Sequence, residues 1–167
     1  MQKIQRYFLE ITKKDYKNCE PNLSENSKIN LDDKKNFDIN KFFYKQIGID
    51  HYWRDRLIWT DKEWSNYVKD RNLETWILKT NNDLVGFYEQ KYHKNNEVEL
   101  INMGIMKEYR GKKIGSKLLL HSIKTAFQKN SKRIWVHTCS LDHKYALQNY
   151  LSKGFKVFKK EEISFVA

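Results

Sequence analysis

Cysteine is nearly absent from this 167-residue sequence, and no long apolar run is present. The two cysteines, Cys19 and Cys139, are too few for a disulfide framework and show no metal-ligand spacing. No apolar segment approaches the ~20 residues that a membrane-spanning helix needs. The first residues, MQKIQRYFLEIT, alternate in polarity where a secretion signal would have an apolar core. These absences lead us to expect a cytoplasmic protein with no membrane partner.

Proline and glycine are scarce as well, with one and six residues respectively. The single proline, Pro21, lies in the polar stretch 13–35, which is the most loop-like part of the chain. There is no internal repeat and no low-complexity tract that would mark a linker. Because hydrophobic residues make up 40% of the chain, it can bury one sizeable core. We expect a single domain over residues 1–167.

Acidic residues are few in the C-terminal part of the chain. Residues 107–167 carry 14 of the 32 basic side chains but only 4 of the 21 acidic ones, so most of the net charge of +11 lies there. A nucleic acid, an anionic surface or a polyphosphorylated cofactor would each be attracted to such a segment. The alternative is purely compositional, because the chain uses lysine heavily throughout.

The sequence does contain a clear succession of strand-like and helix-like patterns. Strands are expected at 6–11, 74–80, 84–93, 97–106 and 133–139, with one or two more after 155. Helices are expected at 37–48, from 61, at 114–126 and at 142–153, with Asp61 and Asp142 as candidate N-caps. This order predicts an α/β fold with a mixed, mostly antiparallel central sheet flanked by helices.

Three cations and two glycines stand directly before or at the start of the helix expected from residue 114. They form the stretch RGKKIG, residues 110–115. Glycines let an anion approach the backbone, and the N–H groups at a helix start can bind phosphate. A solvated basic loop that precedes an ordinary surface helix is the alternative interpretation.

A second motif lies at the expected helix near residue 146. Ala146, Tyr150 and the pair Gly154-Phe155 follow one another at four-residue spacing. Together with RGKKIG, this motif resembles the two signatures of the GNAT superfamily, the acetyl-CoA-dependent N-acetyltransferases. Lys113 replaces the first glycine of the family signature. The resemblance covers the chain from its first strand onward and implies a GNAT-like single-domain fold, acetyl-CoA as co-substrate and no metal.

The resemblance also implies which residues contact acetyl-CoA. The loop before the helix would hold the phosphates, and the strand at 97–106 would pair with the pantetheine arm and polarise the thioester carbonyl through a backbone N–H. His143 falls where the family often has an asparagine that touches this arm. The implied cofactor-binding residues are Met103, Gly104, Ile105, Arg110, Gly111, Lys112, Lys113, Ile114, Gly115, Ser116 and His143.

Two residues are candidates for acid–base catalysis. Tyr150 matches the family's general acid for the departing CoA sulfur, because a phenol of pKa ~10 is protonated at neutral pH. Glu99 matches the position where some family members carry a glutamate base. The structural alternatives are a packed core tyrosine and an exposed strand glutamate. Cys139, between His137 and His143, also suggests a covalent mechanism, but family members generally transfer the acetyl group directly, which favours a packed cysteine.

The resemblance implies that the first two helices and the loop between them form one side of the acceptor site. Trp53 and Asp55 lie in that loop and suit an ammonium group, although tryptophans there can equally pack the helices on the sheet. The implied function is transfer of acetyl from acetyl-CoA to a primary amine of a small molecule or a protein, by direct attack in a ternary complex. A homodimer is compatible with it.

Two alternatives stay open. One is a basic module that binds RNA or DNA through the C-terminal lysines, although no RNA-binding motif is present and the charges gather around a loop suited to phosphate. The other is a non-catalytic sensor of acyl-CoA with the same fold.

Overall fold

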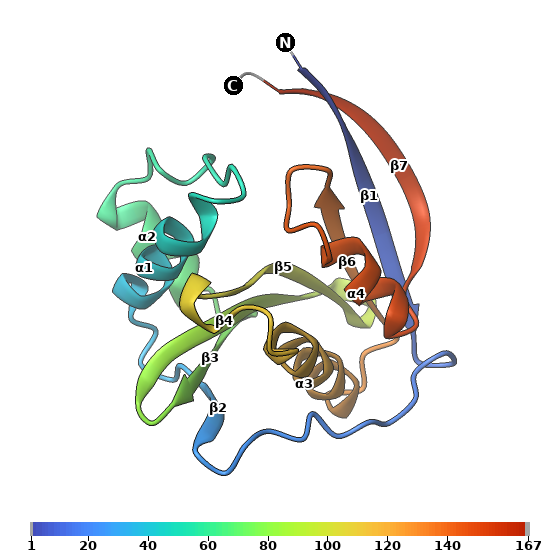
Figure 1. Ribbon diagram of the computed structural model, residues 1–167, viewed down its shortest axis with the longest axis horizontal. Coiled ribbons are helices and arrows are strands. Elements are labelled where there is room, and N and C mark those ends of the chain that lie inside the picture. Colours follow the sequence, from blue (N-terminus) through green and yellow to red (C-terminus); the bar gives the residue numbers. More distant parts are fainter. Residues whose placement is uncertain (1, 166–167) are drawn as a thin grey trace.

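The computed structural model describes residues 2–165 (Figure 1). Its strands are β1 (Gln2–Thr12), β2 (Ser27–Leu31), β3 (Leu73–Thr80), β4 (Asp83–His93), β5 (Glu97–Ile105), β6 (Arg133–Cys139) and β7 (Lys156–Phe165). Its α-helices are α1 (Phe37–Gly48), α2 (Asp61–Lys69), α3 (Ile114–Gln128) and α4 (Ala146–Ser152). None of these described helices is long and apolar enough to cross a membrane.

The strands form one seven-stranded sheet in the order β2-β3-β4-β5-β6-β1-β7. All neighbours are antiparallel except β5 and β6, which run parallel and are joined through α3. The expected α/β fold with a mixed, mostly antiparallel sheet is therefore confirmed. β1 lies between β6 and β7, so strands from the two ends of the chain build one side of the sheet (Figure 1).

The expected loop at 13–35 contains a strand, β2. This strand pairs with β3, from Ser27 opposite Thr80 to Leu31 opposite Trp76. It is a short edge strand without a buried residue, so its stability comes from pairing with β3 more than from its own composition. After residue 155 the chain forms a single strand, β7.

The N-cap of helix α2 lies one residue before the position that the sequence predicts. The cap is Thr60 and not the expected Asp61, because the Thr60 hydroxyl accepts a hydrogen bond from the Glu63 N–H at 3.3 Å. The Glu63 carboxylate in turn accepts from the Thr60 N–H at 2.7 Å, which completes a capping box.

Helix α4 begins at residue 146, so the expectation of a helix capped by Asp142 is wrong. The Asp142 carboxylate accepts hydrogen bonds from the Thr138 hydroxyl at 2.5 Å and from the Cys139 N–H at 3.0 Å. Asp142 therefore stabilises the turn that follows β6. Its carboxylate accepts hydrogen bonds from residues at the end of that strand instead of capping a helix.

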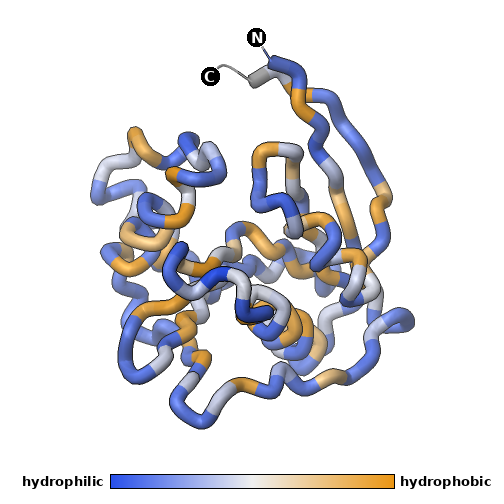
Figure 2. Tube along the Cα trace, viewed as in Figure 1, coloured by the Kyte–Doolittle hydropathy of each residue, from blue (hydrophilic) through white to orange (hydrophobic). Residues whose placement is uncertain are grey.

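Two hydrophobic clusters hold the helices on opposite faces of the sheet. On one face, Phe43 of α1 stacks on Phe87 of β4 with ring centroids 4.8 Å apart. On the other face, α3 and α4 bury the larger cluster, which includes Leu118, Leu119 and Tyr150. Figure 2 shows hydrophobic segments along the central strands and α3, whereas most turns are hydrophilic.

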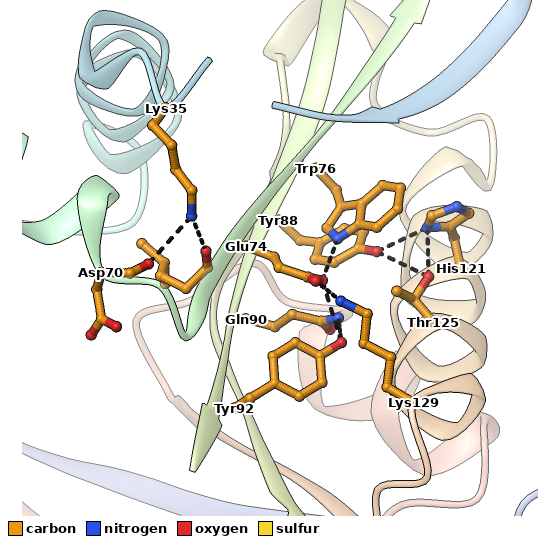
Figure 3. Close-up of polar contacts among 11 residues, drawn as sticks. Lys35, Asp70, Glu74, Trp76, Tyr88, Gln90, Tyr92, His121, Thr125 and Lys129 are labelled. Carbon is orange, nitrogen blue, oxygen red and sulfur yellow. Dashed lines mark hydrogen bonds and ion pairs between the residues drawn. The ribbon is translucent and has the colours of Figure 1, made fainter. Parts of the chain in front are cut away.

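A group of polar contacts joins α3 to β3 and β4 (Figure 3). The Glu74 carboxylate accepts a hydrogen bond from Trp76 Nε1 at 2.9 Å and is ion-paired with Lys129. Nearby, His121 Nδ1 lies 2.9 Å from the Tyr88 hydroxyl. Burial lowers the pKa of His121 to about 4, so this ring is packed in its neutral form.

Candidate functional site

A pocket of about 730 Å³ opens where β5 and β6 separate. The two strands pair only between Glu97–Glu99 and Arg133–Trp135, and each then continues without the other. The separated ends of both strands line the pocket, together with residues from α1, the α1–α2 loop, the start of α3, α4 and β1. Because these elements come from both faces of the sheet, the pocket passes through the opening between the strands.

The β5 side of this opening presents free backbone groups. The N–H of Met106, just beyond β5, donates to the Val85 carbonyl at 2.8 Å, so it faces β4. Backbone direction alternates along a strand, and Gly104 therefore also faces β4. Met103 and Ile105 consequently point their N–H groups toward the pocket, which both residues line. Of the three β5 residues that the sequence implicated, only these two can offer a donor there.

Gly104 serves a different purpose. A Cβ at this position would lie 2.6 Å from Ile47 Cγ2, so only glycine lets α1 pack this closely on β5. This contact sets the distance between the helix and the strand at the pocket wall.

The loop before α3 has an unusual backbone. Gly111 has φ of +85° and Lys113 has φ of +60°, both in the left-handed region. Lys113 occupies the position of the first signature glycine, and its conformation explains why glycine suits that position. Lys112, although implicated by the sequence, does not line the pocket, whereas Lys113 does.

The first turn of α3 leaves space beside the pocket. Ile114, Gly115 and Ser116 all line it. A Cβ added at Gly115 would meet only Ile105 Cγ1, at 3.8 Å, which is an ordinary contact. The positive end of the 15-residue helix is therefore accessible to a ligand at this point.

Arg110 lines the pocket but is already engaged within the protein. Its Nε donates to the Ile105 carbonyl at 3.0 Å, and its Nη1 lies 2.9 Å from Asp50 Oδ2. The hydrogen bond from Arg110 lowers the pKa of the Asp50 carboxyl. Arg110 thus ties the residues after α1 to the end of β5 and fixes the two walls of the pocket relative to each other.

Tyr150 projects from α4 into the pocket and is 7% exposed. Its ring packs at a steep angle against Phe155, with centroids 5.6 Å apart. Among the described residues, no group forms a hydrogen bond with its hydroxyl. Burial, and to a smaller extent Asp142, raises the pKa of this phenol, so the hydroxyl keeps its proton at neutral pH.

Glu99 lies at the edge of the site and is not among the residues that line the pocket. Its Oε1 is 3.3 Å from Nε2 of His93, and its side chain is 22% exposed. The position that the resemblance assigned to a base therefore faces a histidine on the neighbouring strand.

Three histidines line the pocket: His51, His137 and His143. Partial loss of hydration is the largest cause that lowers the pKa of each, and nearby arginines add to the effect, although the His137 and His143 side chains are exposed. His143, which the sequence implicated, packs edge-on against His51 with ring centroids 5.9 Å apart. All three rings are therefore biased toward the neutral form, which can accept a proton.

Trp53 and Asp55 both line the pocket, as the resemblance implied. The Trp53 side chain packs directly on Gly48, where a Cβ would approach Trp53 Cβ to 2.6 Å. Its ring also lies 5.6 Å from that of Tyr44. The tryptophan therefore does both things that the sequence allowed: it packs the loop on α1 and it forms part of the pocket wall.

A buried charge pair that could not be predicted from the sequence supports this wall. Arg56 Nη1 lies 3.2 Å from Oε1 of Glu89, with side-chain exposures of 10% and 1%. Asn40 and Asn102 each donate a further hydrogen bond to Glu89, at 3.1 and 3.0 Å. The Tyr67 hydroxyl accepts from Arg56 Nη2 at 3.0 Å. A charge buried this deeply needs such partners, so the α1–α2 loop is held firmly on β4 and β5.

Cys139 also lines the pocket, at the end of β6. Burial is the main cause that raises the pKa of its thiol, so the side chain stays protonated and is a weak nucleophile. Within residues 2–165 there is no group of three or more His, Cys, Asp or Glu side chains placed to hold a metal ion.

The fold and the sequence match known acetyltransferases. An aminoglycoside acetyltransferase from an uncultured soil metagenomic sample, solved with trehalose, is similar at a TM-score of 0.66, with 14% identity over 86% of this chain and 96% of that one. A GCN5-related N-acetyltransferase from Sphaerobacter thermophilus gives a TM-score of 0.72 and 13% identity over 94% of this chain. Only 49% of that protein is covered, so our chain spans about half its length.

An IAA acetyltransferase from Bacillus cereus is similar at a TM-score of 0.58, with 20% identity over 80% of this chain and 79% of that one. Identities this low show the shared fold alone. No curated protein matches the sequence. The model of the acetyltransferase (GNAT) family matches residues 36–155, which is most of the chain. The chain therefore belongs to the GNAT acetyltransferase family.

Proposed function

We propose that this protein transfers an acetyl group from acetyl-CoA to a primary amine by direct attack in a ternary complex. The observation that carries the proposal is that three features line one pocket: the free backbone edge of β5, the glycine-containing start of α3 and the Tyr150 hydroxyl. Acetyl-CoA, when bound, supplies an acetyl thioester whose carbonyl an amine can attack and whose thiolate can leave. The remaining chemistry comes from residues of this chain.

The start of α3 fits the phosphates of CoA. Open space surrounds Gly111, and Gly115 has one distant neighbour, so a phosphate can approach the backbone at both. The N–H groups that no helical carbonyl satisfies point toward this space and would bind anionic oxygens. Lys113 adds a positive charge at the pocket wall. Arg110 contributes indirectly, because its contacts with Ile105 and Asp50 fix the loop.

The edge of β5 fits an acetyl thioester. The N–H groups of Met103 and Ile105 face the pocket, and a donor at such a position holds and polarises a carbonyl oxygen. Their direction is fixed by pairing with β4, so no reorganisation is needed during the reaction.

Tyr150 is suited to hold the proton that the leaving thiolate needs. Its hydroxyl has no competing partner in the described part of the chain, and its raised pKa keeps it protonated. A phenol in this state can donate to a developing negative charge, which is the role of a general acid.

The proton of the acceptor ammonium needs a base, and we propose His137 for this role. His137 lines the pocket, whereas Glu99 does not. The pKa of His137 is lowered, first by partial loss of hydration and then by the charge of Arg6, which favours the neutral ring near pH 7. The charges of Asp142, Glu99 and Asp55 act in the opposite direction.

Trp53 and Asp55 form the wall where the amine would enter. An aromatic face and a carboxylate both attract an ammonium group. Because one similar protein of known structure is an aminoglycoside acetyltransferase, solved with trehalose and with sisomicin, we place small-molecule amines before protein amines among the acceptors.

Calorimetry with acetyl-CoA, followed by thiol release over a panel of amines, tests the proposal. The panel comprises an aminoglycoside, a polyamine, amino acids and a short peptide with a free N-terminus. We expect micromolar affinity for acetyl-CoA and amine-dependent release of CoA. Binding without release for every amine would favour the sensor.

An oligonucleotide titration tests the nucleic-acid alternative. We expect weak binding that disappears as salt is raised to physiological strength, because only unspecific charge contacts are available. Tight, selective RNA binding at that salt concentration, with no affinity for acetyl-CoA, would instead support the nucleic-acid function.

A further inference from the structure

We infer that the acceptor amine also carries an anionic group, a carboxylate or a phosphate, and that Arg6 binds it. This inference rests on the proposed function and names the substrate class of the same site. It starts from the position and the missing partners of one arginine on β1.

Arg6 forms part of the pocket wall opposite the α1–α2 loop. It lies on β1, where it stands opposite Cys139 of β6, and directly opposite residues of an antiparallel pair share a face. Both residues line the pocket, as does Ile4, two positions earlier on the same face. Arg6 therefore presents its guanidinium to the same space as the separated end of β6.

The guanidinium of Arg6 lacks a partner among the described residues. Its Nε is buried without a hydrogen bond. Glu161 of β7 stands opposite Arg6 in the register. The Glu161 carboxylate is ion-paired with Lys159, with Oε1 and Nζ 2.5 Å apart, and the charge of Arg6 makes a smaller contribution to the lowered pKa of Glu161.

The other arginines of the pocket are already neutralised. Arg56 is ion-paired with Glu89 and Arg110 with Asp50, so both charges are compensated, although Arg110 Nη2 is buried without a hydrogen bond. The three pocket histidines have lowered pKa values and carry little charge at neutral pH. Lys113 lies with the phosphate-binding loop before α3. On the acceptor side of the described pocket, Arg6 is thus the cation that is available to a ligand.

A partly buried cation without a partner is costly, and an anionic ligand removes this cost. A guanidinium binds carboxylate and phosphate oxygens through two parallel N–H donors, which fixes the direction of the ligand as well. Across the pocket, Asp55 has no ion pair with any described residue and can face an ammonium group. A cation and an anion on opposite walls suit an acceptor that carries both charges, such as an amino acid.

Matched pairs of acceptors test the role of Arg6. We would compare α-amino acids with their carboxamides, and phosphoethanolamine with ethanolamine, by thiol release with acetyl-CoA. The two sets distinguish a carboxylate from a phosphate. We expect the anionic member of one set to be favoured by roughly 10- to 100-fold in kcat/KM, which is the usual worth of a hydrogen bond to a charged group.

The variant Arg6→Gln should abolish this preference, so that both members of each pair react alike. Any effect of the variant through the pKa of His137, which Arg6 lowers, acts on both members equally and leaves their ratio unchanged. Arg6→Lys should restore part of it, because the charge returns without the planar fork. Lys3→Gln is the matched control: it removes one positive charge from the same strand, outside the pocket, where Lys3 is paired with Glu162. This control should leave the preference unchanged.

Each other outcome has a definite meaning. Equal or better turnover of the uncharged members, or equal losses for both members in Arg6→Gln, would overturn the inference and leave the acetyltransferase function standing. The same holds if acetyl-CoA binds and only cationic amines such as polyamines are acetylated. Absence of acetyl-CoA binding would instead overturn the proposed function itself.

Discussion

Replacing Tyr150 with phenylalanine separates catalysis from packing. The ring lies in the larger hydrophobic cluster and contacts Phe155, and both features persist in Tyr150→Phe. Its hydroxyl forms no hydrogen bond with a described residue, so its removal breaks no internal interaction. We therefore expect the free energy of unfolding to change by less than about 1 kcal/mol, the usual net worth of a hydrogen bond.

The effect on the reaction should be far larger. Loss of a general acid costs ~10²–10⁴-fold in rate, or about 3–5 kcal/mol of barrier. The raised pKa of Tyr150 keeps this hydroxyl protonated, so it can donate a proton that phenylalanine cannot supply. We expect kcat to fall in this range while the affinity for acetyl-CoA stays nearly unchanged.

Steady-state thiol release, single-turnover kinetics and calorimetry together measure these quantities. The single-turnover experiment is needed to establish that acetyl transfer limits the rate. If the variant reacts within a few-fold of the wild type when transfer is rate-limiting, Tyr150 is a packing residue and water protonates the thiolate. A large loss of stability would contradict the structural part of the reasoning.

Three further predictions concern other parts of the molecule. Gly115→Asp should abolish acetyl-CoA binding in calorimetry without loss of thermal stability. The Cβ of the new side chain would contact only Ile105, and an acidic residue is favourable at a helix start. Unchanged affinity would refute the phosphate site. His137→Gln should lower kcat at pH 7 and remove the acidic limb of the pH–rate profile. The wild-type ring must be neutral to accept a proton, and its lowered pKa keeps it neutral at pH values above that limb. An unaltered profile would return the role of base to Glu99 or to water. The pKa of His121 is about 4 in the folded state against 6.5 when unfolded, so its contribution to stability is present above pH 6.5 and is lost as the pH falls toward 4. Because the ring is partly exposed and screened by solvent, denaturant unfolding should show a loss on the order of 1–2 kcal/mol over this range, which is absent in His121→Gln.

The main elements of the fold could be predicted because their patterns are local. The helix at 37–48 and the strand at 133–139 appear with the expected bounds, since apolar periodicity and flanking turns set both. β2 could not be predicted in this way. Its residues alternate weakly in a polar stretch, and only pairing with β3 makes them a strand.

In the candidate site, too, local motifs could be predicted and long-range contacts could not. The motif around Gly111 and Gly115, and the spacing that ends at Tyr150, are continuous in sequence, and the structure brings all three to one pocket. Arg6 and the Arg56–Glu89 pair were missed, because their roles depend on contacts across long sequence separations. A single arginine in a strand or loop is most often solvated, and nothing local distinguishes one that has been buried beside a pocket.

The central position of β1 has a consequence for the order in which the protein is made. β1 is synthesised before both of the strands with which it pairs, which begin at Arg133 and Lys156. Its backbone hydrogen-bonding groups therefore stay unpaired until β6 and β7 have left the ribosome, and synthesis proceeds at ~5–20 residues per second. During these seconds a strand with two open edges and an apolar face is exposed to other chains. We expect the yield of soluble protein to depend on chaperones that bind nascent N-terminal segments, more than in proteins whose first strand pairs with its neighbour in sequence.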